Sequence, residues 1–180
     1  MTTWGNYVSA NHEAMSSVST DRLDELLQTL EDVRAKQGSV WVLGNGGSAS
    51  LASHAVADFS KTASSTGGKP LKTFAPSEMV SLQSAYSNDV SFEAGFSATL
   101  DMYLQPKDVV LIFSVSGKSP NLLQAMASAK RIGSRVAGVV GQSGEHLRSQ
   151  ADVLLVLESL DYQIVENVQL AIMHWITKKL

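Results

Sequence analysis

The sequence predicts an α/β fold, a three-layer αβα sandwich built on a doubly wound parallel sheet of five strands. Two observations predict it. Five short runs rich in Val, Leu and Ile alternate along the chain with stretches of helical composition. The runs are continuously apolar, which is typical of strands that are covered on both faces. Ligands bind such sheets beyond the carboxyl ends of the strands, so we expect a site in the segments that follow the strands.

Composition narrows the functional classes. The 180 residues suffice for one domain with a sizeable core, and we expect residues 1–180 to form it. A net charge of −3 argues against nucleic acid as a partner, and no apolar run is long enough to span a membrane. Without cysteine there is no thiolate chemistry, and the polar N-terminus lacks a signal-peptide pattern, so we expect a cytoplasmic protein. Only 17% of the residues are charged, which indicates self-association.

Two helices are expected before the sheet. Residues 4–15 form a short amphipathic segment, and residues 1–38 together form a helical arm that packs on the domain or on a neighbouring subunit. Thr20 is the expected N-cap of the second helix, whose leucines recur on one face. The expected strands that follow are residues 40–43, 71–75, 109–114, 136–140 and 153–157.

A glycine turn, Gly44-Asn45-Gly46-Gly47-Ser48, follows the first strand and opens an expected helix over residues 49–61. This arrangement aims backbone N–H groups and a helix N-terminus at an anion. Asn45 tolerates left-handed dihedral angles, and Ser48 can cap the helix or donate to an oxygen. The turn therefore indicates a phosphate-bearing ligand, although a plain connection between strand and helix is the alternative.

A serine-rich loop, Ser114-Val115-Ser116-Gly117-Lys118-Ser119-Pro120-Asn121, follows the third strand. Pro120 suits the first position of a helix, which makes Ser119 the natural N-cap and leaves Ser114 and Ser116 to face a ligand. The loop is interpreted as a hydroxyl-lined phosphate cradle or, alternatively, as a capped turn.

These two turns, with His54 on the helix after the first, strongly resemble the sugar isomerase (SIS) domain proteins. Among them the chain is most similar to the phosphoheptose isomerases, which convert sedoheptulose 7-phosphate to a manno-heptose 7-phosphate. The resemblance covers almost the whole chain. It implies the SIS fold with N-terminal helices and a long C-terminal helix, and a homotetramer with active sites at subunit interfaces. It also implies a phosphorylated sugar as substrate and a divalent metal, typically zinc.

The resemblance implies that both turns contact the phosphorylated substrate. Val115 stands where the isomerases usually carry threonine, so one phosphate hydroxyl is missing while the backbone N–H remains. The other positions match the motif in type, and they are Asn45, Gly46, Gly47, Ser48, Ser114, Ser116 and Ser119.

An aldose–ketose isomerase needs a base that moves a proton between C1 and C2 through an enediol, and an acid or a metal that stabilises the oxyanion. His54 and Asp58 are four residues apart on one helix face, so they could ligate one metal or divide the roles of ligand and base. An ordinary interface or core histidine is the alternative for His54. By resemblance, His174 is the catalytic acid and a metal ligand, and Asp58 replaces the glutamate that is the proposed base.

Glu166 falls where the isomerases carry glutamine, and it completes a predicted substrate and metal set with His54, Asp58 and His174. Glu166 and His174 are eight residues apart, about 12 Å along a helix, so an ion touching both would lie midway between extended side chains. Asp89 follows the expected helix 78–86 where the family has a substrate-facing acid, although a helix stop is the alternative.

Three functions are compatible with the sequence. The first is a metal-assisted isomerase of a heptose-sized ketose phosphate, with Asp58 and His174 as base and acid. The second is a regulatory SIS protein of the replication-initiator-binding type, in which Asp58, Val115 and Glu166 would be signs of decay. The third is an isomerase of another phosphosugar. Retention of both His54 and His174 favours an enzyme.

Overall fold

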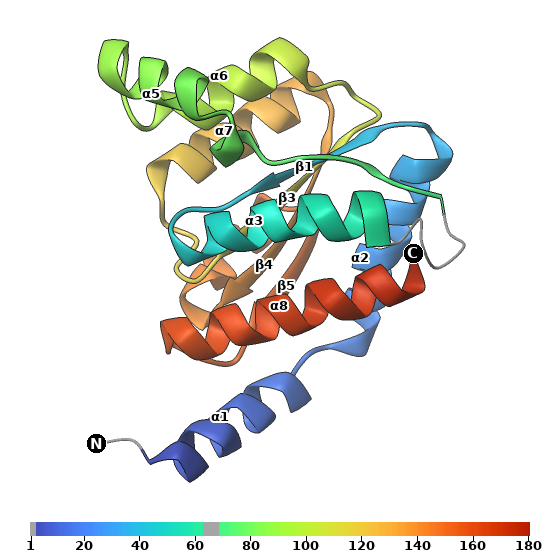
Figure 1. Cartoon of the computed structure of the whole chain (residues 1–180), viewed down its shortest axis with the longest axis vertical. Coiled ribbons are helices and arrows are strands. Elements are labelled where there is room, and N and C mark those ends of the chain that lie inside the picture. Colours follow the sequence, from blue (N-terminus) through green and yellow to red (C-terminus); the bar gives the residue numbers. More distant parts are fainter. Residues whose placement is uncertain (1–2, 63–68) are drawn as a thin grey trace.

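The computed structural model describes residues 3–62 and 69–180 as an αβα sandwich (Figure 1). All five strands are parallel and lie in the order β2-β1-β3-β4-β5. Each strand ends within one residue of its expected bounds, so the predicted fold class is confirmed. The strands are β1 (Ser39–Leu43), β2 (Lys72–Phe74), β3 (Val109–Ser114), β4 (Arg135–Gly141) and β5 (Val153–Leu157).

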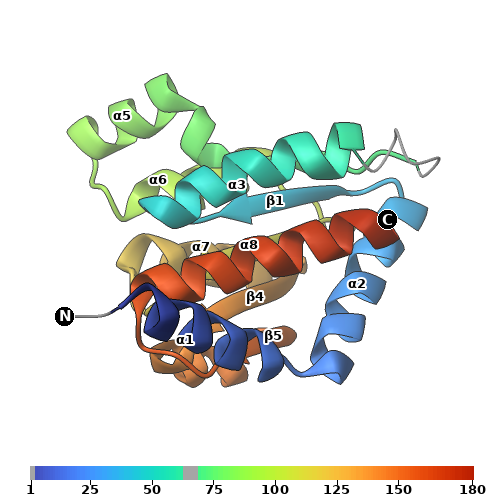
Figure 2. The same cartoon turned by 60° about the horizontal axis from the view of Figure 1, so that its bottom comes forward.

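Helices cover both faces of the sheet (Figures 1 and 2). Successive strand residues point to opposite faces, and both faces are buried, which explains the continuously apolar strands. Val42 and Leu111 belong to the apolar cluster beneath one helical layer, whereas Leu43 and Ile112 belong to the cluster beneath the other. The first layer is formed by α2 (Thr20–Ala35), α3 (Gly47–Ala57) and α8 (Tyr162–Lys179), and the second by α6 (Ala94–Tyr103) and α7 (Pro120–Ile132).

The N-terminal helix α1 (Trp4–Ser16) packs on the outside of α8 (Figure 2). Asn167 Nδ2 of α8 donates hydrogen bonds to Tyr7 Oη at 2.6 Å and to Asn11 Oδ1 at 2.9 Å. The expected N-cap of α2 was wrong by one residue. Ser19 has extended dihedral angles and its hydroxyl accepts the N–H of the third helical residue, whereas Thr20 is already helical.

Two further helices differ in their bounds from the sequence-based expectations. The helix after β1 begins at Gly47 rather than residue 49, and it continues from Ala57 into a π-helix, η1 (Asp58–Thr62). The helix expected over residues 78–86 is α5 (Val80–Asp89), preceded by the 3₁₀ turn η2 (Pro76–Glu78). A second 3₁₀ segment, η3 (Gln142–Ser149), follows β4. Among the described residues, no helix has both the length and the apolar character needed to cross a membrane.

Candidate active site

The two predicted turns meet at the carboxyl ends of β1 and β3. These strands are neighbours, but the chain leaves β1 for α3 on one face and β3 for α7 on the other, which opens a crevice between the turns. Asn45 and Asn121 bridge it, because each Nδ2 donates to the other residue's Oδ1 at 2.9 Å. Asn121 is 1% exposed, and its Oδ1 also accepts the N–H of Leu122. A reciprocal amide pair therefore joins the two turns.

The glycine turn brings the first turn of α3 to this crevice. Gly46 has φ 55° and ψ −125°, a conformation that favours glycine. Gly44 approaches so closely that a Cβ would lie 2.4 Å from the carbonyl oxygen of Ser48. Gly46 is the N-cap of α3, so Ser48 does not cap the helix; it is the second helical residue and is buried. The N–H groups of the first turn consequently lack a side-chain cap.

The serine loop folds as a tight turn ahead of α7. Ser114 Oγ accepts the N–H of Gly117 at 3.0 Å, and Gly117 takes a left-handed φ of 65°. Ser119 is the N-cap of α7 and Pro120 is its first residue, as predicted. Ser119 makes no side-chain capping bond, and it lines the pocket between the two turns.

A small pocket of about 130 Å³ lies between the two turns and the start of α8. Polar uncharged groups predominate in it, and Glu166 is the one charged residue among the described residues that line it. Tyr162 and Glu166 are four residues apart, so both extend from one face of α8. The lining consists of Asn45, Ser48, Phe113, Ser114, Val115, Ser116, Ser119, Tyr162 and Glu166.

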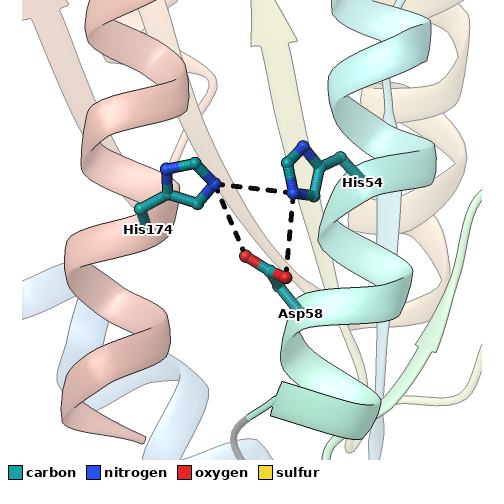
Figure 3. A group of neighbouring side chains, drawn as sticks. All are labelled: His54, Asp58 and His174. Atoms are coloured by element: carbon teal, nitrogen blue, oxygen red, sulfur yellow. Dashed lines mark hydrogen bonds and ion pairs between the residues drawn. The ribbon is translucent and has the colours of Figure 1, made fainter.

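His54 of α3, Asp58 of η1 and His174 of α8 converge on one point (Figure 3). The two Nε2 atoms are 3.5 Å apart, and each lies 3.7 Å from a different carboxylate oxygen of Asp58. The imidazoles are 45% exposed and the carboxylate 15%. Asp58 opens the π-helix, a kind of irregularity that is frequent at functional sites.

These three residues fit a divalent cation. A tetrahedral zinc ion with Zn–N bonds of about 2.0–2.1 Å separates its nitrogen ligands by about 3.4 Å, close to the 3.5 Å between the two Nε2 atoms. Two imidazoles and one carboxylate are ligands that zinc commonly takes, and three protein ligands leave a fourth position for water or substrate. The chemistry of the donor set therefore supports metal binding.

Comparison with known proteins identifies the family. The sequence model of the family described as "SIS domain" matches residues 3–141. The chain belongs to the SIS domain family. A phosphoheptose isomerase of Pelobacter propionicus is 34% identical over 151 residues, or 84% of this chain and 79% of that protein. A probable phosphoheptose isomerase of Thermoplasma volcanium is 29% identical over 95% of this chain and 87% of its own length. The structure of a phosphoheptose isomerase from Neisseria gonorrhoeae superposes with a TM-score of 0.88 over 98% of this chain and 93% of its own, at 22% identity.

Two residues predicted for the site of this SIS domain protein lie apart from the metal-donor group, although Glu166 does line the pocket as predicted. The metal-donor group among the described residues contains no Glu166, since eight residues of helix separate that side chain from His174. Its carboxylate instead lies over Gly47, where an added Cβ would be 2.5 Å from Oε1. Asp89 ends α5, is exposed and accepts a hydrogen bond from Asn88, and it lines neither the pocket nor the metal-donor group of this chain.

Sequence reasoning gave no role to three residues that shape the SIS site. Asn121 and Tyr162 were missed because they gain their roles from the meeting of separate elements. Gln169 is fully buried on α8, and its Nε2 donates to the carbonyl oxygens of Ser114 at 3.2 Å and Val139 at 2.8 Å. An amide within an otherwise apolar helix face was the available signal for Gln169.

Proposed function

We propose that this SIS domain protein is a metal-assisted isomerase that converts sedoheptulose 7-phosphate to D-glycero-D-manno-heptose 7-phosphate. The observation that carries the proposal is the convergence of His54, Asp58 and His174, two of them on helices whose first turns line a hydroxyl-lined pocket. The substrate class rests on the names of the relatives. The Pelobacter propionicus protein is named a phosphoheptose isomerase, and the Thermoplasma volcanium protein a probable one.

The pocket and the metal-donor group are spaced for one elongated ligand. Gly47 and Glu166 face each other at the starts of α3 and α8, and His54 and His174 face each other further along the same two helices. Seven or eight residues correspond to about 11–12 Å of helix. The phosphate would therefore lie at the serine loop while C1 and C2 reach the histidines, which suits the extended carbon chain of a heptose.

The serine loop and the glycine turn would bind the phosphate and the adjoining carbons. Ser114, Ser116 and Ser119 offer hydroxyls, and the backbone N–H groups at the starts of α3 and α7 favour an anion. Val115 has no hydroxyl and would offer only its backbone N–H to the phosphate. Asn45 and Ser48 of the first loop would contact the sugar phosphate from the other side of the crevice.

The reaction moves one proton from C1 to C2 through an enediol, and Asp58 is the proposed base. One oxygen of a carboxylate can bind a cation while the other oxygen accepts a proton. His174 would stabilise the developing oxyanion either by donating a proton or, when its Nε2 holds the metal, as a ligand of the cation that stabilises it. A divalent metal, which we propose is zinc, would be held by His54, Asp58 and His174 and would supply positive charge to stabilise that oxyanion.

We further propose a homotetramer whose sites lie at subunit interfaces. None of the ten residues of α5, all of them described, is buried, and large apolar side chains on and just after it are exposed, including Val80, Val90 and Phe92. On α1, Trp4 is 78% exposed. Association would cover these surfaces and could bring Asp89 to the site of a neighbouring copy. Light scattering of the purified chain tests this, and a monomer at micromolar concentration would contradict it.

The experiment that tests the function is direct. Purified protein, with zinc and after chelation, is incubated with sedoheptulose 7-phosphate while aldose formation is followed, and His174→Ala serves as the inactive variant. We expect metal-dependent turnover that the variant lacks. If the sugar phosphate raises the Tm without any turnover, the isomerase proposal is wrong and the regulatory alternative replaces it.

A further inference from the structure

We propose that Gln169 is a positioning residue for the phosphate end of the site. Its side-chain amide fixes the peptide plane between Ser114 and Val115, so that the backbone N–H of Val115 is directed at the anion. The inference rests on the proposed function for the identity of the pocket as a phosphate site. It gives a role to a buried residue that does not itself line the pocket.

Gln169 differs from the rest of the buried face of α8. The other buried residues of this helix are apolar except Thr177, whose hydroxyl donates within the helix to the carbonyl oxygen of Met173. The Gln169 amide instead bonds outside its helix. Its Nε2 donates to the carbonyl oxygen of Ser114 at 3.2 Å and to that of Val139 at 2.8 Å. Gln169 therefore connects α8 with the last residue of β3 and with β4.

Stability alone does not account for this amide. Because two carbonyl oxygens face the side chain, its NH2 group must point to them and its Oε1 must point elsewhere. Within residues 3–62 and 69–180, Gln169 Oε1 is buried without a hydrogen-bond partner. A buried oxygen without a donor costs free energy, and an apolar side chain of the same length would avoid that cost. The two bonds that Gln169 donates are therefore what distinguishes it from such a side chain.

These bonds fix the start of the serine loop. The C=O and N–H groups of a trans peptide point in opposite directions, and the described residues contain no cis peptide. With the carbonyl oxygen of Ser114 held by Gln169, the N–H of Val115 points away from that amide. The carbonyl oxygen of Val115 in turn accepts the N–H of Gly141 at 3.1 Å. Two successive peptide planes are thus held where β3 enters the loop.

Val115 depends on this orientation more than the serines beside it do. It lines the pocket without a hydroxyl, so its N–H is the donor that it can offer to a ligand. Ser116 and Ser119 can rotate their hydroxyls to suit a ligand, whereas a backbone N–H is directed only by its peptide plane. A donor that is already oriented binds an anion more tightly than one that must first be ordered. Loss of the Gln169 bonds should therefore weaken phosphate binding.

The test replaces the amide by an apolar side chain of the same length. Gln169→Met removes both donated bonds and also the unpaired oxygen, so its Tm should stay within about 4 °C of the native value. Titration calorimetry should show that inorganic phosphate binds this variant about tenfold more weakly than the native chain. The matched control is Thr177→Val, which removes a buried polar group of α8 that bonds only within its helix. It should bind phosphate within about twofold of the native chain.

A second measurement reports on the peptide plane itself. In protein labelled with ¹⁵N-valine, added phosphate should move the amide proton resonance of Val115 downfield in the native chain and in Thr177→Val. The same resonance should move little in Gln169→Met. If the Val115 resonance of the native chain does not respond to bound phosphate, the inference is wrong, even where Gln169→Met does not fold.

Binding of phosphate to Gln169→Met within about threefold of the native affinity would also overturn the inference, as would failure of the native chain to bind phosphate. A much larger loss of Tm in Gln169→Met than in Thr177→Val, with the Val115 response retained, would make Gln169 a structural residue instead. The proposed function fails by a different measurement, the absence of sedoheptulose 7-phosphate turnover. Weaker phosphate binding and a lost Val115 response in an inactive protein would leave Gln169 as the positioning residue of a phosphosugar-binding protein.

Discussion

The two ends of the candidate site are built differently. The phosphate end is held by hydrogen bonds within the chain: the Asn45–Asn121 amide pair, the bond from Gly117 to Ser114, and Gln169 beneath β3. At the other end, His54, Asp58 and His174 stand 3.5–3.7 Å apart, with imidazoles 45% exposed. The fold therefore completes the first end with its own hydrogen bonds, whereas the donor atoms of the second end have a spacing that is compatible with a divalent cation.

Removing His174 should have the largest effect, because it takes both a metal donor and the proposed acid from the incomplete end. We expect His174→Ala to lower kcat by about 1,000-fold while the affinity for inorganic phosphate changes less than threefold. Steady-state kinetics and phosphate titration measure the two quantities. His12→Ala, which removes an exposed histidine of α1, is the control. Equal losses of kcat in both variants would contradict the assignment.

Zinc should also stabilise the folded protein, because it is expected to bind at His54, Asp58 and His174. At a free concentration 100 times its Kd, zinc is expected to raise the free energy of unfolding by about 2.7 kcal/mol, since it binds only the folded arrangement of the three donors. Denaturant unfolding with zinc and with chelator measures this. The increment should vanish in His54→Ala, and an increment that persists there would mean that zinc binds elsewhere.

Breaking the Asn45–Asn121 amide pair tests whether these hydrogen bonds hold the two turns together. Asn121→Ala removes the buried amide of the pair and leaves the amide of Asn45 without its partner, so we expect a loss of about 2 kcal/mol in unfolding free energy and weaker phosphate binding. Asn45→Ala and the double variant complete a mutant cycle. Because the two residues bond each other, the double variant should lose less than the sum of the single losses. Additive losses would show that the pair does not couple the turns.

The smallest effect is expected from adding a hydroxyl to the pocket between the two turns. Val115 lines the pocket and is nearly the size of threonine, so Val115→Thr should tighten inorganic phosphate binding by about threefold. Val153→Thr makes the same change on a strand away from the pocket and should bring no gain. If phosphate affinity falls in Val115→Thr, the side chain does not face the anion.

Sequence reasoning recovered the features that depend on neighbours along the chain. The five strands follow from continuous apolar runs, the cap at Ser119 from its place before Pro120, and the shared face of His54 and Asp58 from a four-residue spacing. The approach of His174 to that face was anticipated from family resemblance, because no local pattern places α8 beside α3.

The features that were missed depend on how separate elements meet. Asn121 bonds Asn45 only because β1 and β3 are adjacent in the sheet. Glu166 was predicted as a metal ligand from its place in the family pattern, and in the structure it lies about two turns of α8 from His174 and faces Gly47. The position of the first turn of α3 over its carboxylate could be learned only in three dimensions.

The amide pair has a consequence for how the protein responds to its medium. Neither asparagine carries a charge or exchanges a proton with water across the biological range, so acid or salt cannot weaken the bridge as they weaken an ion pair. We therefore expect the two turns to stay joined across changes of acidity and salt that would loosen a bridge made of charged side chains.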